Sequence, residues 1–178
     1  MSTRMYLVPI AALLLAGVAP AQGWQETKSE HGGFKLLMPG KARYLKQNIS
    51  TAIGMIELHR FTVYTENGSI VYTILYNDYP EDYVRKTGAK ELLLDTQKRS
   101  HGPLQDATIK NDKEIKLGEF PGRQFEVTGT DPAGNTIYCS WRHYLKGNRL
   151  YQLGVLGTGA QDNAENLKKF FDSFALPE

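Results

Sequence analysis

The chain has almost no cysteine and almost no net charge, and both shortages limit what it can be. Cys139 is the single cysteine among 178 residues, so no disulfide can form within the chain and its stability has to come from packing. The 21 lysines and arginines nearly balance the 19 aspartates and glutamates, which leaves a formal net charge of +2. A chain so close to neutral has no electrostatic reason to bind nucleic acid or an anionic membrane. We therefore expect neither as a partner.

The sequence also lacks the local signatures of common catalytic sites. It contains no G-x-S-x-G elbow, no G-x-x-x-x-G-K-[ST] phosphate loop and no H-E-x-x-H zinc motif. Enzymes can be built without these motifs, but their absence weakens the case for catalysis. We therefore expect no enzyme activity, and we assign no catalytic residue, no metal ligand and no cofactor.

One long apolar run is present, from Met5 to Val18. It follows the single basic residue Arg4 and precedes a small-x-small site that ends at Ala21. This order is typical of a secretory signal peptide, so we expect cleavage between Ala21 and Gln22. The run is shorter than the roughly 20 apolar residues of a membrane-spanning helix, and Pro9 interrupts it. After cleavage we expect no stable membrane insertion, and the alternative is a membrane-tethered sensor domain that keeps this segment.

Removal of residues 1–21 leaves residues 22–178, which is the length of one ordinary domain. Because Arg4 is the only charged residue of the removed segment, the mature chain carries about +1. The sequence thus predicts a single-domain protein that is secreted or periplasmic.

The stretch from Thr136 to Leu156 predicts a central hairpin. Two runs rich in Tyr, Trp, Ile, Leu and Val flank Lys146-Gly147-Asn148, and both Gly and Asn tolerate the positive φ that a tight antiparallel turn requires. We expect further strands at residues 34–38, 43–50, 54–65, 69–77, 108–117 and 123–128, each bounded by turn residues.

Two of these strands, residues 54–65 and 69–77, carry apolar residues on both faces, so the sheet needs cover on both sides. One helix is expected at residues 89–100. Another is expected near the C-terminus, where Leu167, Phe170, Phe171 and Phe174 follow the spacing of a single helix face. The sequence therefore predicts an α+β fold, an antiparallel sheet with helices on both faces in an α/β/α sandwich.

Two stretches resemble known proteins. The segment Asn148-Arg149-Leu150-Tyr151-Gln152-Leu153, followed later by Phe170-Phe171-Asp172-Ser173-Phe174, is similar to the end of PsbP-like domains. The segment from Gly32-Gly33-Phe34 to Met38-Pro39-Gly40 resembles secreted bacterial proteins of no assigned function. The resemblance implies an antiparallel sheet between helical layers. It also implies an exported accessory or binding module, since the PsbP-like family is mostly not enzymatic.

Aromatic side chains are the main candidates for binding. Tyrosine and tryptophan bury large ring areas while their polar tips accept water, so they suit a pocket or a flat interaction surface, although core packing also uses them. The leading hypothesis is an exported, soluble, non-catalytic binding or assembly module for an unidentified protein or small-molecule partner. Its candidate binding residues are Tyr72, Tyr76, Trp141, Tyr144 and Tyr151.

The alternative hypothesis is a small metal-dependent or hydrolytic enzyme that uses His59, Cys139 and His143. Cys139 and His143 are four residues apart and so share a strand face, and His59 joins them if its strand is a neighbour. A buried, inert thiol is the simpler interpretation of Cys139. Asn48 and Asn67 begin Asn-x-Ser triplets, which are glycan acceptors only in a eukaryotic secretory route.

Overall fold

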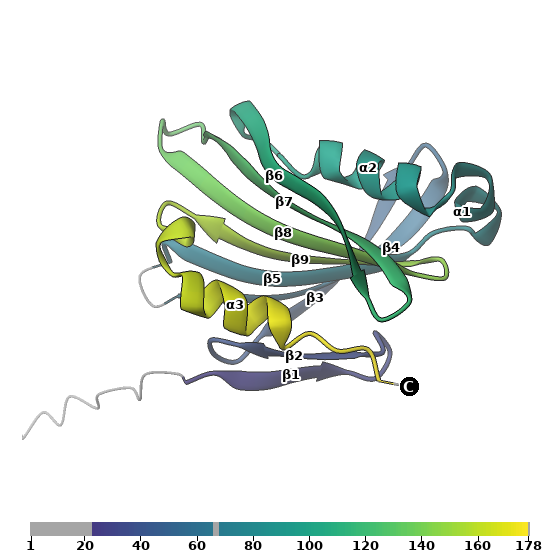
Figure 1. Ribbon diagram of the computed structural model, residues 1–178, viewed down its shortest axis with the longest axis horizontal. Coiled ribbons are helices and arrows are strands. Elements are labelled where there is room, and N and C mark those ends of the chain that lie inside the picture. Colours follow the sequence, from purple (N-terminus) through teal and green to yellow (C-terminus); the bar gives the residue numbers. More distant parts are fainter. Residues whose placement is uncertain (1–22, 66–67, 178) are drawn as a thin grey trace, which may run out of the picture.

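The computed structural model describes residues 23–65 and 68–177 (Figure 1). The expected signal peptide, its cleavage site between Ala21 and Gln22, and Asn67 lie outside the described residues. Export and the extent of the domain therefore remain predictions from the sequence.

Strands make up most of the described chain, and the helices are few and short. The strands are β1 (Gln25–Ser29), β2 (Phe34–Met38), β3 (Arg43–Thr51), β4 (Gly54–Tyr64), β5 (Ile70–Asp78), β6 (Gln105–Leu117), β7 (Phe120–Thr130), β8 (Thr136–Lys146) and β9 (Arg149–Gly157). The helices are α1 (Glu81–Thr87), α2 (Ala89–Arg99) and α3 (Ala164–Asp172), with a 3₁₀ turn at Ala160–Asp162.

The main sheet has seven strands in the order β3-β4-β5-β9-β8-β7-β6, and every neighbouring pair is antiparallel. The hairpin β8–β9 turns at Gly147, whose φ is +60°, and β9 is the middle strand. The predicted antiparallel sheet with this hairpin at its centre is confirmed.

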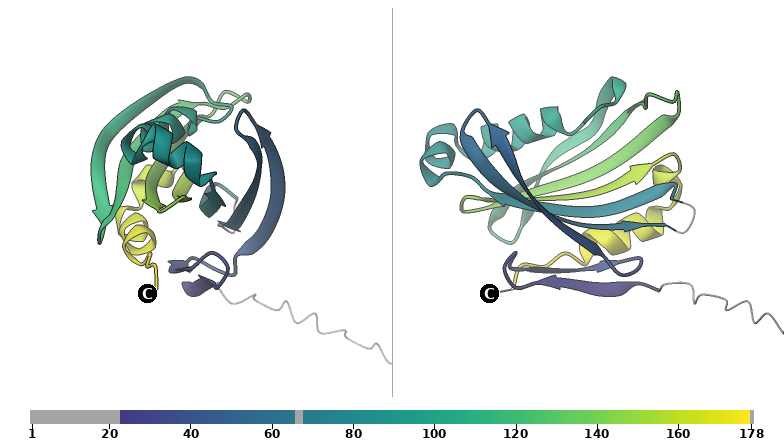
Figure 2. Two further views of the ribbon diagram at one scale, coloured as in Figure 1. Left: turned by 90° about the vertical axis from the view of Figure 1, so that its right-hand side faces the viewer. Right: turned by 180° about the vertical axis from the view of Figure 1, so that it is seen from behind.

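The predicted cover by helices on both faces is wrong. The sheet curves around α2 on its concave face, while the β1–β2 hairpin covers the convex face with α3 beside it (Figure 2). The reason is the small amount of helix: one helix, α2 with 11 residues, lies on the concave face, and one, α3 with 9, lies beside the hairpin. A helix is about 10–12 Å across, whereas seven strands about 4.8 Å apart span about 29 Å. The protein is thus mostly β rather than an α/β/α sandwich.

The β1–β2 hairpin can cover a face because β2 is two-sided. Phe34, Leu36 and Met38 are buried, whereas Lys35 between them is exposed. This period of two is that of a strand lying flat on a core. The backbone groups of Lys35 and Ala175 exchange two hydrogen bonds of 2.9 Å, which join the hairpin to the chain after α3. The strand predicted at residues 34–38 therefore forms a separate two-stranded sheet and does not enter the main one.

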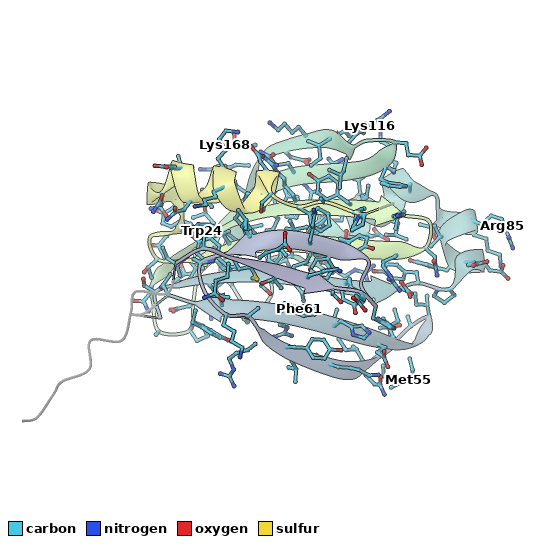
Figure 3. All side chains as sticks on the ribbon, turned by 90° about the horizontal axis from the view of Figure 1, so that it is seen from below. Trp24, Met55, Phe61, Arg85, Lys116 and Lys168 are labelled. Carbon is cyan, nitrogen blue, oxygen red and sulfur yellow. The ribbon has the colours of Figure 1, made fainter. Side chains whose placement is uncertain are left out.

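Aromatic rings fill the convex core between the hairpin, α3 and the sheet. The Phe34 ring lies 5.4 Å from Phe61, 5.9 Å from Tyr76 and 6.4 Å from Tyr151, measured between ring centroids. The predicted phenylalanine stripe near the C-terminus is buried, with Phe170 wholly enclosed and Phe174 4% exposed. Figure 3 looks onto this face with the hairpin in front of the sheet.

Truncation of Phe34 should weaken the whole domain. We expect Phe34→Ala to lower the free energy of unfolding by about 3–5 kcal/mol, because it removes a buried ring and leaves a cavity. Urea denaturation of the purified domain measures the loss. Lys35→Ala, on the exposed side of the same strand, is the matched control and should change stability by less than about 0.5 kcal/mol. Equal effects of the two substitutions would contradict the role given to the hairpin.

Candidate functional site

The concave face of the sheet is ordered in rows, because the strand register sets residues of β4, β5, β9 and β8 side by side. Neighbouring rows are two residues apart along each strand, which is about 6.6 Å. The first row is Tyr64, Val71, Leu156 and Cys139. The second row is Thr62, Thr73, Gly154 and Trp141, and the third is Arg60, Leu75, Gln152 and His143.

A groove of about 600 Å³ lies over these rows. The three rows line its floor except for Gly154, which the Trp141 ring covers, and His143, which is beneath α2. The end of α2 with residues 100–104 forms the wall. Its lining is largely apolar with a few polar groups, and its volume is within the range of small-molecule sites. This groove is the candidate functional site.

The groove exists because α2 covers only part of the concave face. Leu92 and Leu93 of α2 pack on Leu145 and Leu150, at the end of the β8–β9 hairpin. Further along the helix, the Thr96 hydroxyl lies 3.2 Å from Nδ1 of His143. No described helix lies over the part of β4 and β5 that lines the groove, so their concave side chains remain open to a ligand.

Trp141 forms the middle of the floor because its neighbour on β9 is a glycine. A Cβ atom at Gly154 would overlap the Trp141 ring, so only glycine lets this ring lie flat across β9. Trp141 is 8% exposed, and in the described part of the chain its Nε1–H has no hydrogen-bond acceptor. The groove thus presents one large ring, whose Nε1–H is enclosed and unpaired.

Arg60 gives one end of the groove a positive charge. It stands between Leu45 and Leu75 in the register, and its buried Nε has no hydrogen-bond partner among the described residues. Arg99 also lines the groove and forms an ion pair of 3.6 Å with Asp95. No aspartate or glutamate is among the described residues that line the groove. The site is therefore cationic and has no internal carboxylate to neutralise Arg60.

The polarity of the groove changes along its length. The end formed by Tyr64, Val71 and Leu156, with Ile137 beside it, is apolar. Two rows away, the end formed by Arg60 and Gln152 is polar, with Arg99 and Tyr79 also in the lining. Such a gradient fits a molecule with one apolar and one polar end.

The sheet divides the five aromatic residues singled out in the sequence. Tyr72, Tyr76, Tyr144 and Tyr151 lie on the convex side and are at most 4% exposed, whereas Trp141 lies in the groove. Two of the tyrosines tie the hairpin to the sheet: the Tyr151 hydroxyl donates to the Gly32 carbonyl at 2.7 Å, and the Tyr76 hydroxyl lies 2.9 Å from Nδ1 of His31. Their role in binding remains a prediction, and the five do not form one surface.

The three residues of the enzyme hypothesis are not brought together. His59 is on the convex side with Tyr76, onto which its ring stacks, whereas Cys139 and His143 are on the concave side. His59 instead contacts the Tyr44 hydroxyl at 2.8 Å and the Glu57 carboxylate at 2.9 Å. Burial lowers the pKa of His59, although Glu57 opposes this effect. Within residues 23–65 and 68–177, no cluster of three or more His, Cys, Asp or Glu side chains is placed to hold a metal ion.

His143 is an uncharged structural residue beneath α2. The Thr96 hydroxyl donates to the Leu93 carbonyl at 2.9 Å, so its oxygen accepts from Nδ1–H of His143. Nε2 then carries a lone pair and no hydrogen. It is enclosed beside Phe125 and Trp141 and has no hydrogen-bond partner in the described residues. Complete burial lowers the pKa of His143 from 6.5 to about 3.

Sequence reasoning did not single out most of the groove residues, namely Arg60, Val71, Leu75, Gln152 and Leu156. A signal was present in β4, where Arg60 is the one charged residue on the strand face that also carries Ile56, Leu58 and Tyr64. Val71, Thr73 and Leu75 alternate with the buried convex residues of β5, which marks a second apolar face. What the pattern does not reveal is that this face lacks full cover.

The architecture defines a PsbP-like fold. The chain is similar to the solution structure of cyanobacterial PsbP (CyanoP) from Synechocystis sp. PCC 6803, with a TM-score of 0.54, 12% identity, and 90% of this chain and 96% of that one covered. It also aligns with the protein of unknown function PA94 from Pseudomonas aeruginosa, with a TM-score of 0.39, 10% identity, and coverage of 82% and 91%. In sequence, no protein-family model and no curated protein matches the chain. No helix in the described residues has the length and hydropathy to span a membrane.

Acid should destabilise the protein through His143. Below pH 6.5 the unfolded chain binds a proton on this imidazole, whereas the folded chain does not until about pH 3. The free energy of unfolding should therefore fall on acidification by up to about 1.4 kcal/mol per pH unit from this residue alone. His143→Leu should flatten the pH dependence between these values in urea titrations. The unaltered domain, titrated in parallel, is the control.

The thiol of Cys139 should be unreactive in the folded protein. Burial raises its pKa to about 11, and the residue is 2% exposed. Because the thiolate is the reactive species, we expect iodoacetamide at pH 7.5 to modify Cys139 only after denaturation, as judged by intact mass. Rapid alkylation of the native protein would contradict this assignment and support a nucleophilic cysteine.

Proposed function

We propose that the chain is an exported, soluble, non-catalytic binding module whose ligand occupies the groove on the concave face. The observation that carries the proposal is a largely apolar groove of about 600 Å³ whose lining includes Arg60 and no acidic side chain among the described residues. Apolar surface that stays in contact with water is unfavourable. A ligand would remove this surface from water and would give Arg60 a partner.

The rest of the molecule supports a binding role more than a catalytic one. His59, Cys139 and His143 lie on opposite faces of the sheet, and the buried His143 imidazole and Cys139 thiol have pKa values far from neutrality. General acid–base and nucleophilic catalysis need groups within reach of one another and matched to the working pH. The PsbP-like fold is compatible with a non-catalytic module.

Export is the part of the proposal that rests on the sequence. The basic start, short apolar run and small-x-small site of residues 1–21 support it. N-terminal sequencing of the mature protein from its native source should begin at Gln22.

A neutral apolar dye should bind in the groove. We expect N-phenyl-1-naphthylamine to bind the domain saturably at one site, with a rise in fluorescence as the dye leaves water. Val71→Trp places a large ring in the apolar end of the groove and should weaken binding at least tenfold. Ile109→Trp makes a similar change at an exposed position of β6 that does not line the groove, and should leave affinity unchanged.

Three results would count against the groove as the binding site. They are an absence of saturable binding, binding at several weak sites, and equal binding by the two tryptophan variants. Circular dichroism of both variants establishes that the fold is retained. If the fold is retained, a loss of dye binding results from the change in the groove and not from unfolding.

A further inference from the structure

We infer that the ligand of the groove is a small amphiphile with one anionic head group, bound with its head at Arg60 and its apolar tail toward Val71 and Leu156. This inference rests on the proposed function, because it assigns a chemical class to the occupant of the same groove. Carboxylate and phosphate monoester heads share the chemistry that Arg60 would recognise.

The charge of the groove selects an anion. Arg60 is half-buried in the lining of the groove, and no carboxylate of the described chain forms an ion pair with it. An oxyanion is the group that pairs best with such a guanidinium. Since the lining offers arginines and no acidic side chain, a cationic ligand would be repelled and a neutral one would leave Arg60 without a counter-ion.

The polarity gradient sets the direction of the ligand. Two row spacings separate Arg60 from Tyr64 along β4, which is about 13 Å of floor. The row between them holds Thr62, Thr73 and, across Gly154, the Trp141 ring, and the far end offers Val71 and Leu156. An extended alkyl or aromatic tail that starts at Arg60 would lie over these apolar side chains and exclude water from them.

Trp141 gives the tail an aromatic surface in the middle row. Its ring lines the groove and lies over Gly154 of β9, which pairs with Thr73 of β5 in the register. Trp141 is therefore a contact of the tail, and the contact with the head group falls to Arg60.

Competition between ligands of one tail length tests the charge of the head group. Decanoate, decyl phosphate, decan-1-ol and decyltrimethylammonium would each displace bound N-phenyl-1-naphthylamine at pH 8, below their micelle-forming concentrations. We expect at least one anion to bind about tenfold or more tightly than the alcohol. One additional charge-assisted hydrogen bond raises affinity by about this factor. The cation should bind more weakly than the alcohol. The tighter anion identifies the head group.

A matched pair of arginine variants assigns the effect to one residue. Arg60→Gln should remove the preference for the anion over the alcohol, measured as the ratio of their affinities in the same variant. Arg85→Gln removes the same charge from α1, outside the groove, and should keep the preference.

The outcomes separate the inference from the function on which it rests. If the dye binds saturably and the anions compete no better than the alcohol, the inference is wrong and the binding function stands. An anion preference that survives Arg60→Gln also overturns the inference. If the dye does not bind saturably, the proposed function fails as well. The comparison of the four ligands on the unaltered protein decides the charge class even if Arg60→Gln does not fold.

Discussion

The structure depends on keeping both faces of one curved sheet out of water. β4 and β5 carry apolar side chains on each face, so neither face can be left to solvent without a large loss of hydrophobic stabilisation. The convex face is closed by the β1–β2 hairpin and α3, which bury Phe34 and Phe170 completely. The concave face is closed only where α2 reaches, over β7, β8 and the end of β9.

This unequal cover creates the groove. Beside α2 the concave face still presents Val71, Leu75 and Leu156, which line the groove together with the end of the helix. Gly154 lets Trp141 lie across the floor, and Arg60 closes one end with a charge that no described residue neutralises. The helices do not cover the whole concave face, which is why the predicted α/β/α sandwich is wrong. The uncovered part of that face is the space available to a ligand.

Much of the fold was predictable from local pattern. The strand alternation, the Gly147 turn and the spacing of Phe170, Phe171 and Phe174 are set by residues close in sequence. β1 was missed because its residues are largely polar, which suits the outer strand of a hairpin that lies on the surface. The alternation of Phe34, Leu36 and Met38 predicted a half-buried strand, but the pattern is the same whether such a strand joins a sheet or lies across one.

The sequence by itself determined most of the strands, β1 excepted, and that the central sheet is apolar on both faces and no internal disulfide is possible. Only the tertiary structure decided the neighbours of each side chain. The alternation of side chains along a strand determines which residues share a face of that strand. The non-local pairing of β5 with β9 determines which strands share a sheet and in what register. That pairing sets Gln152 beside Leu75, which is in turn beside Arg60 on β4. It also places His59 on the opposite face from Cys139 and His143.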